Sequence, residues 1–185
     1  MSKGIRRLLR DAADEHRRVR VHRSLPGADS VEGFVVAAKG SWTLIAECQN
    51  VQLDGFVAIR TDDIVRIDHR GRQDVTARWL RGNGPWPPPA PRGRISLKDA
   101  RALAESAAGH YGLIGVYEED GNPDSLYIGA LADSGGKVLR LLEVCPKARW
   151  AKVRTKYRYA DITRIDFGDR YQAALAGLAG PRPGR

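Results

Sequence analysis

A basic stretch near the C-terminal end of the sequence, residues 147–158, contains six cations and no acid. Alternate residues of a strand point to the same face, which would align four of these cations in a row. The row comprises Lys152, Arg154, Lys156 and Arg158. Such a row can follow the phosphates of a nucleic acid, and the binding would weaken steeply with salt. The alternative is an ordinary solvated face whose charge is balanced by the acidic residues 118–120.

Residues typical of catalytic or metal sites are sparse. The two cysteines, Cys48 and Cys145, fall near the ends of expected strands, and we interpret both as small buried hydrophobic residues. The four histidines show no metal-ligand spacing. The sequence contains no phosphate-binding glycine loop, nucleophile elbow or HExxH motif. We therefore predict a non-enzymatic protein without cofactor or metal, and an enzyme with an unrecognised site stays as an alternative.

The elements that would position these four cations belong to a unit that occurs twice. Residues 60–68 and 158–166 share the pattern R-x-x-D-I-x-R-I-D, with six of nine positions identical. The apolar helical positions of residues 5–13 recur at residues 100–108. Because these matches keep the same order along the chain, they indicate a duplication.

Each copy is expected to contain one helix followed by five short strands. The first copy has a helix at 3–16 and strands near 18–24, 31–39, 42–49, 55–61 and 64–69. The second has a helix at 97–108, strands near 112–119, 125–133, 137–145, 154–160 and 162–167, and a last helix at 169–178. Closing such strands into a barrel removes unpaired edges. The predicted fold class is therefore mainly β (α+β), with two tandem small β-barrels, each preceded by a helix.

The predicted domains are residues 1–81 and 96–180, separated by a Pro-rich linker at 82–95 and followed by a disordered tail at 181–185. Proline keeps such a linker extended and favours a semi-rigid spacer. The alternative role for the linker is a docking motif that fits an aromatic groove.

Bulk composition limits the class of protein. The chain is 42% hydrophobic, which suffices for a packed core, and its net charge of +9 favours polyanionic partners. No apolar stretch approaches the roughly 20 residues needed to span a bilayer, and the N-terminal residues lack the apolar run of a signal peptide. We expect a cytoplasmic protein with reduced thiols and no membrane partner.

The order of one helix and five strands resembles that of the Sm and Sm-like proteins, including bacterial Hfq. The second Sm motif consists of an apolar strand, Ile-Arg-Gly, a polar turn and another apolar strand. Residues 56–67 resemble it, with Thr61 in place of the glycine. Small barrels of the SH3 or Tudor type would produce similar strands.

The first Sm motif is matched in part. Counting from Gly33, its later positions hold Lys39, Trp42 and Thr43. In the family, the ring-stacking residue, the next position and the arginine of the second motif form a pocket for one nucleotide base. The resemblance therefore places Trp42, Thr43 and Arg60 in a base pocket, where stacking contributes about 1–3 kcal/mol. The alternative is that Trp42 belongs to the core.

The second copy departs further from the family pattern. Gly135, Val138 and Leu139 fill the first-motif positions, although Arg158 is kept. We predict a binding module for nucleic acid, single-stranded RNA in particular. The alternative is a protein-interaction or scaffold module that forms a homo-oligomer, or binds a protein partner, through the edge strands of its barrels.

Overall fold

The computed structural model describes residues 3–71 and 74–184, which form a mainly β structure, as the sequence predicts, with four α-helices where three were expected. In chain order the elements are α1 (Lys3–Asp14), β1 (Arg18–Arg23), β2 (Val31–Lys39), β3 (Trp42–Gln49), β4 (Gln52–Arg60), a 3-10 turn (Thr61–Asp63), β5 (Ile64–His69), α2 (Val75–Asn83), α3 (Ala100–Tyr111), β6 (Leu113–Tyr117), β7 (Tyr127–Gly135), β8 (Val138–Val144), β9 (Trp150–Arg158), β10 (Arg164–Phe167) and α4 (Arg170–Ala179).

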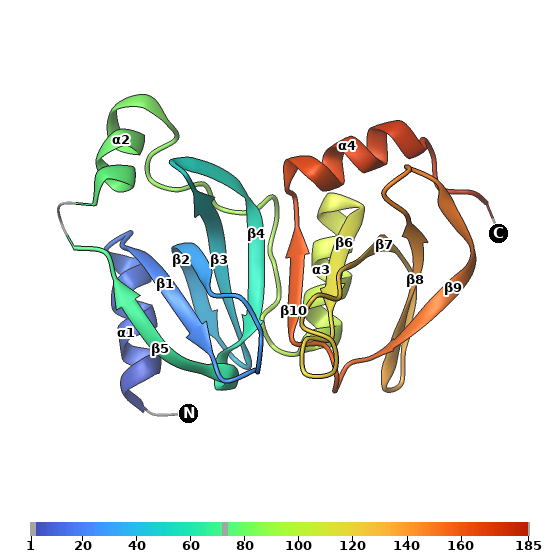
Figure 1. The fold of residues 1–185 in the computed structure, drawn as a ribbon, viewed down its shortest axis with the longest axis horizontal. Helices are drawn as coiled ribbons and strands as arrows, with labels where there is room; N and C mark the ends of the chain where they lie inside the picture. The colour runs from blue at the N-terminus through green and yellow to red at the C-terminus, as the bar shows by residue number, and fades with distance from the viewer. Residues whose placement is uncertain (1–2, 72–73, 185) are drawn as a thin grey trace.

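All ten strands belong to one antiparallel sheet in the order β5-β1-β2-β3-β4-β10-β6-β7-β8-β9 (Figure 1). Each half of the chain contributes five neighbouring strands, and the two halves follow the same internal order. The sheet is open, so the closed barrels that we expected are not confirmed. The reason is the junction: β4 pairs with β10 of the other half, and β5 and β9 are left at the two ends of the sheet.

The largest apolar core is shared by both halves. Along the junction, Phe56 of β4 stacks on Phe167 of β10 with ring centroids 5.6 Å apart, and Tyr111 lies 5.0 Å from Phe167. Helix α3 packs into the same core through its buried face, with residues from both sides of the junction. The core includes Trp42, Leu44, Ala46, Phe56 and Ala58 from the first half, and Leu103, Ala104, Ala107, Ile165 and Phe167 from the second. Joining the halves therefore converts one face of β3 and β4 into interior.

Helix α3 begins and ends about three residues later than expected. The Asp99 side chain accepts a hydrogen bond from the Ala102 amide at 2.8 Å, which makes Asp99 the N-cap. Gly112 ends the helix with a φ of 81°, a conformation that glycine adopts easily.

A buried ion pair also connects the halves. Arg23, at the end of β1, forms two hydrogen bonds with the Glu119 carboxylate, one of them at 2.7 Å. The two side chains are 0% and 3% exposed. The Thr163 hydroxyl donates to the same carboxylate at 2.7 Å, and Arg23 also donates to the Asp29 carbonyl at 2.9 Å. Each charge is thus compensated without access to water.

The sequence interpretation missed α2. This helix follows β5 as α4 follows β10, and both lie along the upper side of the molecule in Figure 1. Asp74 and Asp169 cap the two helices by accepting backbone hydrogen bonds from the third helical residue, at 2.7 and 2.6 Å. A terminal helix is therefore common to both halves, and the linker starts later than residue 82.

The linker is anchored in the first half by Trp86. Its indole packs edge to face on Phe34 at 5.8 Å between centroids, and the Arg81 guanidinium lies 4.6 Å from its ring centre. Trp86 therefore contributes to a small core beneath α2, with Cys48 and Leu80.

Replacing Glu119 by glutamine leaves Arg23 as a buried charge without its counter-ion. We expect the E119Q variant to lose about 3–5 kcal/mol of unfolding free energy, measured by urea denaturation. The matched control is Asp62→Asn, which removes the exposed Arg6–Asp62 pair and should cost less than about 1 kcal/mol. Equal losses in the two variants would contradict this role of the buried pair.

Candidate nucleic-acid interface

Strand β9 forms one end of the sheet and pairs only with β8. Tyr157 points inward opposite Leu139, and both are buried in the shared core. The alternate residues point outward, with Lys156 opposite Arg140 and Arg154 opposite Leu142. The four cations that alternation predicts to share one face of a strand are all exposed, and the strand that carries them is an edge strand. The strand starts at Trp150, four residues earlier than expected.

Three of the four cations have no counter-ion. In the described part of the chain, Lys152, Arg154 and Lys156 make no ion pair or side-chain hydrogen bond. Arg158 differs, because Asp161 accepts hydrogen bonds from its guanidinium at 2.5 and 3.0 Å and raises its pKa. Glu119, which the alternative interpretation assigned to balancing these charges, is instead buried with Arg23. The charge of Lys152, Arg154 and Lys156, called the basic row below, is therefore available to a ligand.

A cavity of about 470 Å³ lies at the start of β9. Trp150 lines it, and the half-buried indole donates a hydrogen bond to the Gly180 carbonyl at 3.4 Å. The other lining residues are Leu142, Ala151, Lys152, Arg154, Arg182, Pro183 and Gly184. Among the residues that the structure describes, the lining thus combines an aromatic ring with three cations and has no carboxylate.

Sequence reasoning missed Trp150 and Arg182 as candidate residues. Trp150 lies within the basic stretch, so its proximity to Lys152 was a usable signal. Arg182 belongs to the segment that we expected to be disordered, and in the structure its guanidinium donates to the Leu131 carbonyl at 2.9 Å. Residue 182 comes close to residue 150 because α4 returns the chain towards the start of β9. A local sequence pattern does not reveal such a contact.

The pocket that the family resemblance implied is not open to a base. Trp42 is only 2% exposed and packs in the core with α3, so neither face of its ring can stack on a ligand. Thr43 is fully buried, and its hydroxyl shares a hydrogen bond of 2.9 Å with that of Thr61. The guanidinium of Arg60 donates to the carbonyl of Ala160. The expectation that Trp42 is a stacking platform is wrong because the β4–β10 junction needs that face as interior.

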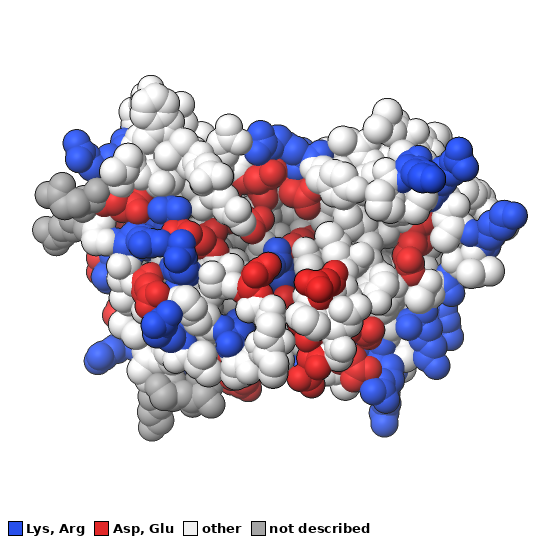
Figure 2. All heavy atoms as spheres, in the orientation of Figure 1, with Lys and Arg blue, Asp and Glu red and all other residues white. Residues whose placement is uncertain are grey.

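The surroundings of this closed pocket also disfavour an anion. A hollow of about 340 Å³ beside Trp42 and Arg60 is lined by Asp62 and Asp99, whose carboxylates repel phosphate. In Figure 2, Asp and Glu gather towards the middle of the face, and Lys and Arg lie both on the left, mixed with acids, and along the right-hand rim where β9 lies.

The two cysteines occupy different environments. Cys48 is buried, and burial raises the pKa of its thiol to about 11. Cys145 is exposed in the turn between β8 and β9, so the expectation that it is buried is wrong. Backbone amides of Arg149 and Lys147 hydrogen-bond to its sulfur and lower the pKa of the thiol.

Within residues 3–71 and 74–184, no group of three or more His, Cys, Asp or Glu side chains is placed to hold a metal ion. None of the helices described there has the length and apolarity needed to cross a membrane. Comparison with family models, with curated proteins and with solved structures found no match to this chain.

The cysteine environments predict different reactivities. With a thiol reagent such as 5,5′-dithiobis(2-nitrobenzoate) at pH 7.5, we expect one equivalent to react quickly, at Cys145, because this thiol is exposed and its pKa is lowered. The second equivalent should react only after unfolding in urea. The C145S variant should lose the fast phase and C48S should keep it; a fast phase that survives in C145S would contradict the assignment.

Proposed function

We propose that this chain binds single-stranded nucleic acid, RNA in particular, along β9. The observation that carries the proposal is the basic row, three exposed cations on an edge strand that have no acidic partner among the described residues. Alternate residues of a strand are about 7 Å apart. A flexible single strand can adjust its phosphates to that spacing, whereas a duplex presents them on a fixed helical path.

Trp150 adds an aromatic surface beside the basic row. A base can stack on an exposed part of an indole irrespective of its sequence, with about 1–3 kcal/mol per base. Lys152, Arg154 and Arg182 surround the same cavity and would neutralise the neighbouring phosphates. The combination suits recognition of a single strand, in which bases are unpaired and accessible.

The strand order supports the interpretation of the halves as two Sm-like units. Each half has a helix, five strands in the same spatial order and a capped terminal helix. The base pocket of the family is replaced in this proposal, because Trp42 and Thr43 are buried and the cations lie on β9.

The alternative function, self-assembly through edge strands, is supported by the two unpaired edges β5 and β9. The junction indicates what such pairing requires, since β4 buries Phe56 and Ala58 there. Aligned through the repeated motif, the corresponding residues of β9 are Arg154 and Lys156. Burying these charges without partners is costly, and charged residues on an edge strand prevent pairing. We therefore favour the polyanion as the ligand of β9.

Removing the basic row tests the nucleic-acid proposal. We expect the K152A/R154A/K156A variant to bind fluorescein-labelled U12 at least about tenfold more weakly at low salt, by fluorescence anisotropy. The slope of log K against log salt should decrease by about 2, because each phosphate contact on a single strand contributes about 0.7.

The control for this test must change the net charge equally. The variant R7Q/R10Q/R78Q removes three exposed cations that lie on α1 and α2. It should bind U12 almost as the wild type does. Wild-type protein that fails to bind at low salt, or equal losses in the two triple variants, would refute the proposal.

The charges on β9 also predict the oligomeric state. Light scattering should give the mass of one chain, 20.4 kDa, because pairing of β9 would bury Arg154 and Lys156. The R154F/K156A variant, which copies Phe56 and Ala58 of β4, should shift the mass towards oligomers. A wild-type dimer or ring, with a monomeric variant, would instead favour the assembly function.

A further inference from the structure

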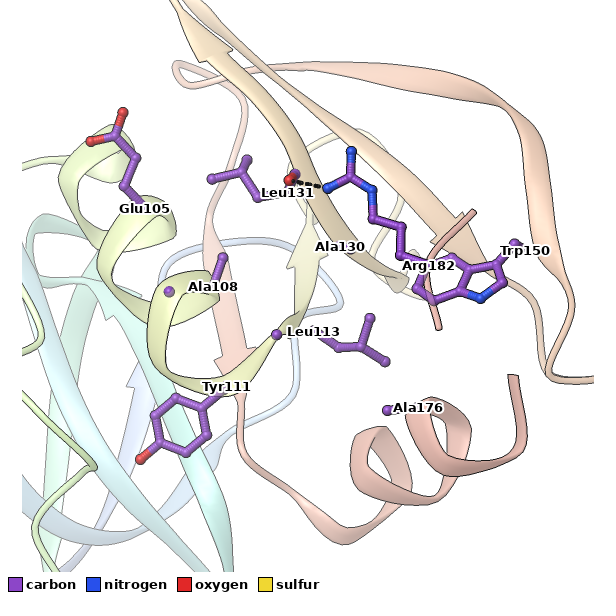
Figure 3. A pocket seen from close by; sticks show the side chains of 11 residues that line it. Glu105, Ala108, Tyr111, Leu113, Ala130, Leu131, Trp150, Ala176 and Arg182 are labelled. Carbon is purple, nitrogen blue, oxygen red and sulfur yellow. Dashed lines mark hydrogen bonds between the residues drawn. The ribbon is translucent and has the colours of Figure 1, made fainter. Parts of the chain in front are cut away.

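A second cavity, of about 580 Å³, lies between α3, β7 and α4 (Figure 3). Its lining is mostly apolar. The small residues are Ala108, Gly109, Gly112, Ala130 and Ala176, and the large apolar ones include Leu113 and Trp150. A volume of this size falls within the range of about 300–1,000 Å³ typical of small-molecule sites. The proposed binding of nucleic acid along β9 makes no use of this space.

The first half has an equivalent place beneath α2, but there two aromatic rings fill the space. Phe34 of β2 and Ala130 of β7 occupy the same place in the two strand orders. Each follows directly a glycine whose register partner on the next strand is a glutamate: Gly33 with Glu47, and Gly129 with Glu143. The phenyl ring of Phe34 is buried beneath α2, whereas the methyl group of Ala130 leaves space beneath α4.

The second ring differs in the same way. Trp86 is the third residue after the end of α2 at Asn83, and Arg182 is the third residue after the end of α4 at Ala179. Trp86 packs on Phe34. Arg182 instead extends past the cavity to the backbone of Leu131, as the dashed line in Figure 3 shows. Two rings in the first half are thus replaced by a methyl group and a guanidinium in the second.

The charges at the rim of the cavity are unequal. On one side, Arg182 uses a single N–H on the Leu131 carbonyl and has further donors available. On another side, the carboxylate of Glu105 accepts hydrogen bonds from Arg101 at 2.8 Å and from Ser134 at 2.5 Å. The negative charge is therefore compensated, and among the described residues the uncompensated charge at the rim is positive.

We infer that this cavity binds a small aromatic acid. The ring would occupy the space that Phe34 and Trp86 fill in the first half, and the carboxylate would lie against Arg182. An apolar ring fits better than a nucleobase, because the lining would leave most polar groups of a base without partners. The site is separate from the basic row, although Arg182 and Trp150 also line the neighbouring cavity.

Indole-3-acetate is a suitable probe, and its binding can be followed by calorimetry. We expect saturable binding of one molecule to the wild type. Ala130→Phe places in β7 the ring that β2 already carries, and Ala176→Phe fills the cavity from an exposed helical position. Each variant should weaken binding at least about tenfold, or about 1.4 kcal/mol. The control Ala173→Phe, exposed on α4 outside the cavity, should bind as the wild type does.

The role of the charge is tested separately. Arg182→Gln should weaken the binding of indole-3-acetate but leave that of neutral indole unchanged. Absence of saturable binding to the wild type, or wild-type affinity in both filled variants with a native circular dichroism spectrum, would overturn the inference. Tighter binding of uridine monophosphate than of indole-3-acetate would also overturn it.

The same variants keep the two proposals distinguishable. A130F should bind labelled U12 as the wild type does, because it leaves the basic row intact. K152A/R154A/K156A should keep its affinity for neutral indole. Loss of one activity without the other therefore identifies which proposal fails.

Discussion

The pairing of β4 with β10 is the constraint on which the rest of the structure depends. It joins two five-stranded units into one open sheet, and it replaces two exposed edges by an apolar seam centred on Phe56 and Phe167. Edge strands are a liability unless they are paired, covered or charged. The molecule pairs two of its four edges internally and leaves β5 and β9 at its ends, where different solutions are needed. The ion pair between Arg23 and Glu119 connects the two halves a second time, between the end of β1 and the segment that follows β6.

The junction also determines which surfaces remain available for binding. Because α3 packs against both halves, the outer face of β3 and β4 becomes interior, and Trp42 is buried with it. The equivalent face of β9 has no such cover, and Arg154 and Lys156 stand where β4 has Phe56 and Ala58. The exposed cations of β9 and the closed pocket at Trp42 are thus two consequences of the same asymmetry between a paired edge and a free one.

Local patterns in the sequence were sufficient for most strands and for the basic row, since alternation depends only on neighbouring residues. They were insufficient for three features that depend on distant contacts. Helix α2 escaped prediction because its outward face carries Val75 and Trp79, which are 71% and 52% exposed and obscure the amphipathic pattern. The apolar run Phe56–Ile59 of β4 is typical of a strand buried on both faces, but it does not reveal that β10 and α3 provide the cover. Trp150 and Arg182 meet only because α4 returns the chain to the start of β9.

The differences between the halves gather in one region. Beneath α2 the chain supplies its own aromatic rings and completes a small core, whereas beneath α4 a cavity remains and a cation lies at its rim. Unfilled apolar volume costs stability unless a ligand or another group occupies it. The cavity adjoins β9, whose basic row has no counter-ion within residues 3–71 and 74–184, and Trp150 and Arg182 line both this cavity and the one at the start of β9. In the two proposals above, the first half therefore mainly supports the sheet, and the second half provides the surfaces for an anionic ligand.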